Sequence, residues 1–151
     1  MYSIDTSALL DAWVRWYPPA VFPSVWKFLE DSVANGTVVA TEEVRHELQR
    51  KEDDLHDWIR RNASMIVPHD DAIQESVLEI LAQFPKLVDE RTSKSMADPF
   101  VIAVARVRGY AVVTGEKGGS PHRPKIPNVC EHFGVRVMGI VELFRERGWA
   151  F

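Results

Sequence analysis

The sequence predicts an α/β fold, a three-layer α/β/α sandwich whose central sheet is mostly parallel. Short runs that suit buried strands alternate along the chain with longer stretches of helical spacing. Such alternation is typical of parallel sheets with crossover helices on both faces. The segment 100–107 is apolar nearly all round, which indicates a central helix packed against the sheet. At 151 residues, the chain is expected to form a single domain, 1–151.

The composition favours a packed protein rather than a membrane protein or a cysteine-rich one. Hydrophobic residues make up 46% and charged residues 26%, close to the globular average. No apolar run approaches the roughly 18 residues that indicate a membrane span, and the start of the chain lacks the pattern of a signal peptide. Cys130 is the only cysteine, which excludes an intrachain disulfide and a thiolate metal cluster. We therefore expect a cytoplasmic protein that makes no contact with a membrane.

The strands are expected where β-branched and aromatic residues gather between turn signals. They are listed in chain order: 2–4, 37–40, 65–67, 111–114 and, at one edge, 135–138. Proline, glycine and capping residues then place the helices between them. These are expected at 8–13, 24–35, from 42 onward, 53–62, 71–84, 100–107, 128–133 and 140–147. Ser24 and Thr41 are the expected N-caps of the second and third of these helices.

The aromatic segment 13–28 allows two interpretations. It contains three Trp, one Tyr and two Phe around three prolines, which break helices and redirect the chain. Aromatic residues at this density usually belong to the core. Alternatively, the segment forms an exposed groove for a partner helix, since Trp and Tyr are enriched at interface hot spots.

Four acidic residues stand out by their positions in the predicted strands and helices. Asp5 comes after the first strand, Glu47 lies on the inward face of a helix, Asp98 opens the central helix, and Glu116 follows the fourth strand. Each has a purely structural interpretation: Asp98, followed by Pro99, would make a good helix N-cap, and the others suit turns. Ligands of open α/β sheets, however, bind beyond the carboxyl ends of the strands, where these acids are expected to meet.

Carboxylates gathered at one edge would repel one another unless a divalent cation joins them. A set of oxygen donors without His or Cys favours Mg²⁺ or Mn²⁺ over Zn²⁺. Such an ion polarises a phosphoryl oxygen and generates a hydroxide nucleophile near neutral pH. The four acids therefore predict a phosphodiester hydrolase. Other patterns fit less well: His46-Glu47 begins like a zinc-protease motif, but Arg50 stands where the second His is needed.

The charge distribution is uneven. The net charge is −4, yet the segment 86–125 contains eight Lys/Arg against four Asp/Glu, whereas the remainder contains ten against eighteen. A basic sector on an acidic protein could attract a phosphate backbone, or it could be an ordinary solvated face. Within it, Lys117, Arg123 and Lys125 follow the fourth strand and are the residues expected to bind the phosphates of such a backbone.

Four motifs together resemble the successive motifs of PIN-domain ribonucleases. They are Ile4-Asp5-Thr6-Ser7, Val44-x-x-Glu47-Leu48, Asp98-x-x-x-Ile102-Ala103-x-Ala105 and Val113-Thr114-x-Glu116. The resemblance covers nearly the whole chain in the family's order. It implies a PIN-like fold and an acidic quartet, Asp5, Glu47, Asp98 and Glu116, that binds Mg²⁺ or Mn²⁺. Thr6 and Thr114 match the family's supporting hydroxyls. Pro99 and the stretch 125–130 depart from the commonest pattern, as expected of a divergent branch.

Within that family, the chain is similar to VapC-type toxins, which cleave RNA and are held inactive by a cognate antitoxin. The resemblance thus implies a metal-dependent endoribonuclease that is the toxin of a toxin–antitoxin pair, with an antitoxin partner and a possible homodimer. Asp5, Asp98 and Glu47 would hold the metal, and Glu116 would assist through its water shell. Two alternatives remain open: a PIN nuclease of routine RNA processing, and a non-catalytic binding module of the same fold.

Overall fold

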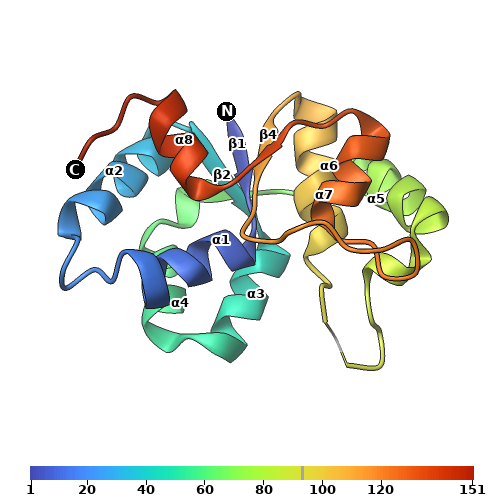
Figure 1. Cartoon of the computed structure of the whole chain (residues 1–151), viewed down its shortest axis with the longest axis horizontal. Helices are drawn as coiled ribbons and strands as arrows, with labels where there is room; N and C mark the ends of the chain where they lie inside the picture. Colours follow the sequence, from blue (N-terminus) through green and yellow to red (C-terminus); the bar gives the residue numbers. More distant parts are fainter. Residues whose placement is uncertain (93) are drawn as a thin grey trace.

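The structure, a computed structural model that describes residues 1–92 and 94–151, contains a sheet of five parallel strands (Figure 1). The strands are β1 (Tyr2–Ile4), β2 (Val38–Thr41), β3 (Ile66–Val67), β4 (Ala111–Val113) and β5 (Val137–Met138). Their order in the sheet is β3-β2-β1-β4-β5. The chain therefore builds outward from β1 in one direction and then returns to build in the other. A ligand crevice is expected at the carboxyl ends of β1 and β4, where the direction reverses.

Helices cover both faces of this sheet, as the sequence predicts. The α-helices are α1 (Thr6–Asp11), α2 (Pro23–Ala34), α3 (Glu42–Lys51), α4 (Asp53–Arg61), α5 (Asp71–Gln83), α6 (Asp98–Arg108), α7 (Ile126–Phe133) and α8 (Ile140–Glu146). Shorter helical turns are the π-helical η1 (Ala12–Trp16) and the 3₁₀ turns η2 (Ala63–Met65) and η3 (Pro85–Leu87). The expected three-layer α/β/α class is confirmed.

Alternate residues of β1 face the two helical layers. Ser3 Oγ donates to the carbonyl of Val101 in α6 (2.9 Å), whereas the Tyr2 hydroxyl donates to Glu146 Oε2 at the end of α8 (2.7 Å). Figure 1 shows α5, α6 and α7 on one side of the sheet, with α1, α2 and α8 on the other. Because both faces of a parallel sheet are covered, its strands are apolar nearly throughout: β1, β2 and β4 are buried at every position.

Four helices, α1, α2, α6 and α7, begin one or two residues earlier than predicted. Helix α2 begins at Pro23, so Ser24 lies inside it and is not its N-cap. Proline suits a first helical position because the N–H it lacks would have no partner within the helix. Helix α7 likewise begins earlier than expected, at Ile126. Thr41 is confirmed as an N-cap, since its hydroxyl accepts the backbone N–H of Val44 (3.4 Å).

The aromatic segment divides between core and surface. Trp26 is 4% exposed, packs edge-on against Trp13 and Trp58 with ring centroids 4.6 and 5.1 Å away, and donates its indole N–H to the carbonyl of Tyr17 (2.7 Å). Four apolar side chains between the start of η1 and the start of α2 are instead exposed: Val14, Trp16, Val21 and Phe22. The core interpretation is thus right for Trp26, but not for those four.

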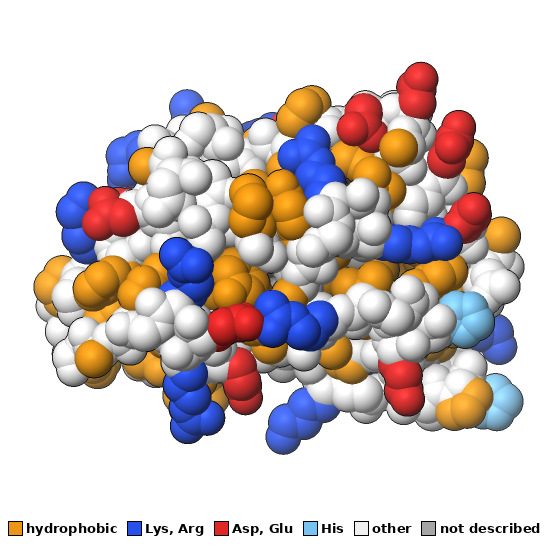
Figure 2. All heavy atoms as spheres, turned by 90° about the horizontal axis from the view of Figure 1, so that it is seen from above, with side chains coloured by type: hydrophobic (Ala, Val, Ile, Leu, Met, Phe, Trp, Pro, Cys, Tyr) orange, Lys and Arg blue, Asp and Glu red, His pale blue; other side chains and the backbone are white. Residues whose placement is uncertain are grey.

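The amino ends of the strands lie on the opposite side of the molecule from the predicted crevice. Figure 2 shows this face, with basic and acidic side chains interspersed among apolar ones. Within the described part of the chain, no helix combines the length and the apolar character that crossing a bilayer requires.

Candidate metal centre

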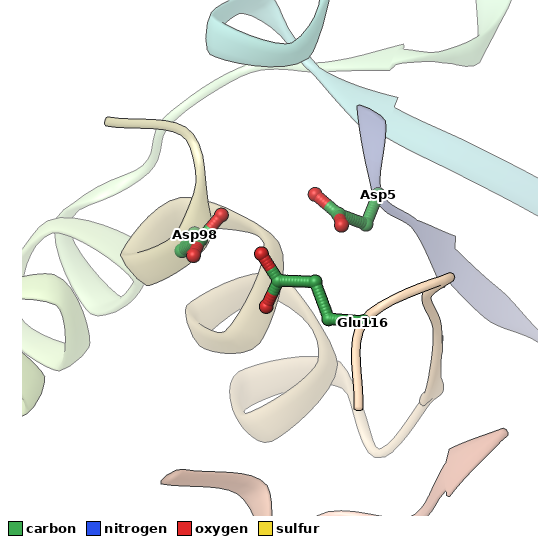
Figure 3. A group of neighbouring side chains, drawn as sticks. All are labelled: Asp5, Asp98 and Glu116. Atoms are coloured by element: carbon green, nitrogen blue, oxygen red, sulfur yellow. The ribbon is translucent and has the colours of Figure 1, made fainter. Parts of the chain in front are cut away.

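Three of the four predicted acids converge at the carboxyl ends of β1 and β4. Asp5, Asp98 and Glu116 each place one carboxylate oxygen within 4.8 Å of the others'. Figure 3 shows the three carboxyl groups directed into one space, from the end of β1, the start of α6 and the loop after β4. Asp5 and Asp98 are 2% and 3% exposed, and Glu116 is partly buried. The order reversal between β1 and β4 is what brings these residues together.

Two hydroxyl groups hold the Asp5 carboxylate. Ser7 Oγ donates to Asp5 Oδ2 (2.6 Å), and Thr114 Oγ1 donates to the same oxygen (3.0 Å). The network continues into the loop after β4, because the N–H of Gly115 donates to Ser7 Oγ (2.9 Å) and that of Glu116 to Thr114 Oγ1 (3.0 Å). Asp5 Oδ2 is thereby held by one hydroxyl from α1 and one from the residue that follows β4.

Of the two hydroxyls that follow Asp5, that of Ser7 contacts the carboxylate and that of Thr6 does not. Thr114 supports the centre as expected, but Thr6 Oγ1 is buried without a hydrogen-bond partner in the described chain, and Ser7 makes the contacts. Because α1 begins directly after Asp5, the residue two positions on turns back towards it. A Ser two residues after a strand-end Asp is the signal from which Ser7 could have been found, since Ser often bonds locally at helix starts.

Ser7→Ala is therefore expected to destabilise the protein by about 1–2 kcal/mol, because it leaves the Asp5 carboxylate and the Gly115 N–H each short of one hydrogen bond. Thr6→Val is the matched control: it removes a neighbouring buried hydroxyl of similar shape and should cost clearly less. Thermal melts of the two variants in EDTA measure the difference. A larger loss for Thr6→Val would contradict the network described above.

Asp98 is not the N-cap of α6. The cap position is Ala97, and Asp98 and Pro99 are the first two helical residues. The Asp98 side chain bonds to no helix N–H in the described chain, and its Oδ2 is buried without a partner. Burial, followed by the charges of Asp5, Glu116 and Glu47, raises the pKa of Asp98 to about 10. A carboxylate placed this unfavourably is better explained by a ligand than by helix capping.

Glu47 lies beside the cluster rather than within it. It is 7% exposed, and its Oε1 accepts the backbone N–H of Ala97 (2.9 Å), which links α3 to the start of α6. Glu116 is inside the cluster, and its Oε2 accepts the N–H of Ile126 at the start of α7 (3.1 Å). Burial is the largest cause raising the pKa of both side chains, and the nearby Asp5 charge adds to it. The sequence motifs place both residues in the metal-binding quartet, with Glu116 assisting through the metal or its water shell; in the structure Glu116 lies in the cluster and Glu47 beside it.

The donors present fit a hard divalent cation. All three are carboxylates, which Mg²⁺ and Mn²⁺ prefer, and the partnerless Asp98 Oδ2 supplies a ready ligand. Asp5, Asp98 and Glu116 would hold such an ion, and waters would complete its coordination, as Mg²⁺ commonly allows.

The cavity over the cluster has a volume of about 500 Å³. Besides the four acids, it is lined by basic side chains that the sequence did not single out: Arg50, Lys51 and Lys94. Of the three predicted RNA-binding residues, Lys125 lies close to the acids. Its positive charge lowers the pKa of Asp98 and Glu116 and so partly offsets the rise that burial causes. Arg123 and Lys125 line a neighbouring groove, whereas Lys117 is exposed and lines neither space.

The sequence matches a protein family over residues 2–151, described as a domain of unknown function, DUF4411. The chain belongs to the DUF4411 family. No curated protein matches it.

Solved structures show what this DUF4411 chain resembles in three dimensions. One is VapBC2 from Rickettsia felis, determined in complex with a DNA fragment from its promoter. That chain is 14% identical, with 91% of this chain and 97% of that chain covered and a TM-score of 0.55. PAE2754 from Pyrobaculum aerophilum is also 14% identical, with 88% and 96% covered and a TM-score of 0.41. The first similarity confirms the VapC-like PIN fold that the sequence motifs imply.

Proposed function

We propose that this protein is a metal-dependent endoribonuclease that hydrolyses RNA phosphodiester bonds. The observation that carries the proposal is the convergence of Asp5, Asp98 and Glu116, with the buried Asp98 Oδ2 left without a partner in the described chain. Such a group is costly unless a cation accompanies it. The VapC-like fold supports the choice of a nuclease. The proposed unit is the whole chain, 1–151, as one PIN-like domain.

The residues around the centre have distinct tasks in this proposal. Asp5, Asp98 and Glu116 hold Mg²⁺ or Mn²⁺, and Ser7 and Thr114 orient Asp5. When bound, the cation polarises a phosphoryl oxygen and lowers the pKa of a coordinated water. Glu47 lies next to that space and would act from outside the ligand set, through a water.

Two features support a substrate with a phosphate backbone. Arg50, Lys51 and Lys94 line the same cavity as the acids, where their positive charges can attract an anionic substrate. Lys125 lies close to the cluster, and Arg123 lies in the adjoining groove. Lys117 stays part of the proposed RNA-binding set as a surface cation at the start of the same loop.

The proposed biological role is that of a toxin controlled by an antitoxin. It is supported by the similarity to VapBC2, which was solved as an assembly of two proteins. The exposed side chains Val14, Trp16, Val21 and Phe22 offer an apolar surface of the kind that an antitoxin helix or a second copy of the chain would cover.

Cleavage of RNA should require Mg²⁺ or Mn²⁺ and cease in EDTA, because every proposed ligand is a hard oxygen donor. The measurement is cleavage of a labelled RNA by the purified chain before chelation, after it, and after Mn²⁺ is added back. The control is Asp5→Asn purified in parallel, which detects a contaminating nuclease. Cleavage by the wild type that survives chelation, with the control inactive, rejects the metal mechanism.

A further inference from the structure

A second groove adjoins the metal centre and is distinctly basic. Its volume is about 630 Å³, and it runs between the segment 85–91 and the segment 122–125. Five Lys/Arg side chains line it against two acids, Asp89 and Glu90. The five are all exposed: Lys86, Arg91, Lys94, Arg123 and Lys125. The groove therefore carries a net positive charge on a protein whose net charge is −4.

The groove adjoins the cavity of the metal centre. Lys94 and Ser95 line both spaces. Lys125 lines the groove and also lowers the pKa of Asp98 and Glu116, so its ammonium group lies near the acids. A chain of phosphates with one phosphate at the metal centre could thus continue past Lys94 and Lys125 into the basic groove.

The cations of the groove are free to bind a ligand. Within residues 1–92 and 94–151, none of the five forms an ion pair with an acid. The nearest acid, Asp89, is already engaged, because its Oδ1 accepts the backbone N–H groups of Arg91 (3.2 Å) and Thr92 (3.4 Å). Exposed Lys and Arg without partners retain their full attraction for phosphate.

Both walls of the groove have a fixed backbone. Asp89 and Lys94 exchange two antiparallel hydrogen bonds (3.0 and 3.2 Å), and Ser120 and Arg123 exchange two more (3.2 and 3.1 Å). Pro124 is buried beneath the second wall. These bridges constrain the backbone at Lys94 and Arg123, which reduces the backbone entropy lost when a ligand binds.

We propose that this groove binds the sugar–phosphate backbone of single-stranded RNA next to the cleaved bond, with Lys86, Arg91 and Lys94 as phosphate contacts. The assignment rests on the proposed nuclease function and extends it by the path of the substrate. A single strand fits because the acids are recessed, at 2–3% exposure for Asp5 and Asp98, and the backbone has to bend between two adjoining spaces. Contacts of this kind depend on charge, so they do not discriminate between bases.

The test measures binding without cleavage. A fluorescein-labelled single-stranded RNA of 12 nucleotides is titrated in EDTA at several salt concentrations, and anisotropy gives Kd. The groove variant carries Lys86→Ala, Arg91→Ala and Lys94→Ala. The matched control carries Arg108→Ala, Arg145→Ala and Arg147→Ala, three exposed cations at or beside the ends of α6 and α8 that line neither cavity. Both variants lose three positive charges, so only the position differs.

The groove variant should bind about 100-fold more weakly at 0.1 M salt, with a salt slope lower by about two units, since each single-strand contact contributes about 0.7. The control should stay within a few-fold of the wild type. In the wild type, RNA should also protect Lys86 and Lys94 from acetylation, read by mass spectrometry, but not Lys27. Equal slopes for both variants, unprotected groove lysines, tighter binding of a duplex, or no binding by the wild type would each overturn the proposal.

This outcome is independent of the proposed nuclease activity. A wild-type chain that binds RNA through the groove but does not cleave it with Mn²⁺ would end the nuclease proposal and leave the groove assignment standing. If the groove variant cleaves RNA with Mn²⁺ and binds it as the wild type does, the groove assignment is wrong and the nuclease proposal stands.

Discussion

Asp98→Asn is expected to lower the rate of RNA cleavage by at least about 100-fold while the protein stays folded. Loss of residues that merely support metal ligands commonly costs 10–100-fold, and loss of a ligand itself should cost at least the upper value. The fold should survive because the Asp98 side chain makes no hydrogen bond to the helix within the described chain, and the cap position belongs to Ala97. Single-turnover cleavage with Mn²⁺, measured beside the melting temperature, tests both parts.

Asp70 provides the matched control for this experiment. It too stands at a helix start, but it is a true N-cap, whose Oδ1 accepts the N–H of Ile73 (2.9 Å). Because Asn caps a helix about as well as Asp, Asp70→Asn should keep both activity and stability. Asp5→Asn should behave like Asp98→Asn in the cleavage assay. If Asp98→Asn cleaves RNA at a rate near that of the wild type, Asp98 is not a metal ligand.

The metal-free protein is expected to lose stability as the pH rises from 5 to 8. The pKa of Asp98 is raised to about 10 in the folded state, chiefly by burial, and those of Asp5, Glu47 and Glu116 are raised as well. Above the unfolded pKa values near 4, the folded state therefore binds more protons than the unfolded state. The free energy of unfolding then falls with rising pH until the folded pKa is passed.

Asp98→Asn should remove much of this pH dependence, because an amide cannot be forced to ionise. One group that is protonated in the folded state and ionised in the unfolded state changes the free energy of unfolding by at most about 1.4 kcal/mol per pH unit. Relaxation of the site is expected to reduce this slope to about half. In EDTA, the variant should melt about 4–8 °C above the wild type at pH 8 and close to it at pH 5. Mn²⁺ should restore the wild type at pH 8, since the ion binds the ionised form. A wild type equally stable at both pH values would disprove this account of the acids.

Much of the fold was predictable from local sequence. All five strands lie within two residues of their expected ends, because β-branched runs between turn signals are a short-range property. The placement of Asp5, Asp98 and Glu116 at one edge also follows from sequence, since the carboxyl ends of parallel strands meet there. This rule for parallel sheets predicted the cluster, and the preference of Mg²⁺ and Mn²⁺ for carboxylate oxygens predicted the ion that it would bind.

The tertiary structure alone decided which side chains actually meet. Glu47 is drawn towards the N–H of Ala97, fifty residues along the chain, whereas Glu116 is held in the cluster by Ile126. Ser7 rather than Thr6 reaches Asp5, because the first turn of α1 sets the direction of each hydroxyl. Lys94 borders both the metal centre and the basic groove only because the chain folds back before α6. Such pairings depend on angles between elements distant in sequence, which local patterns do not encode.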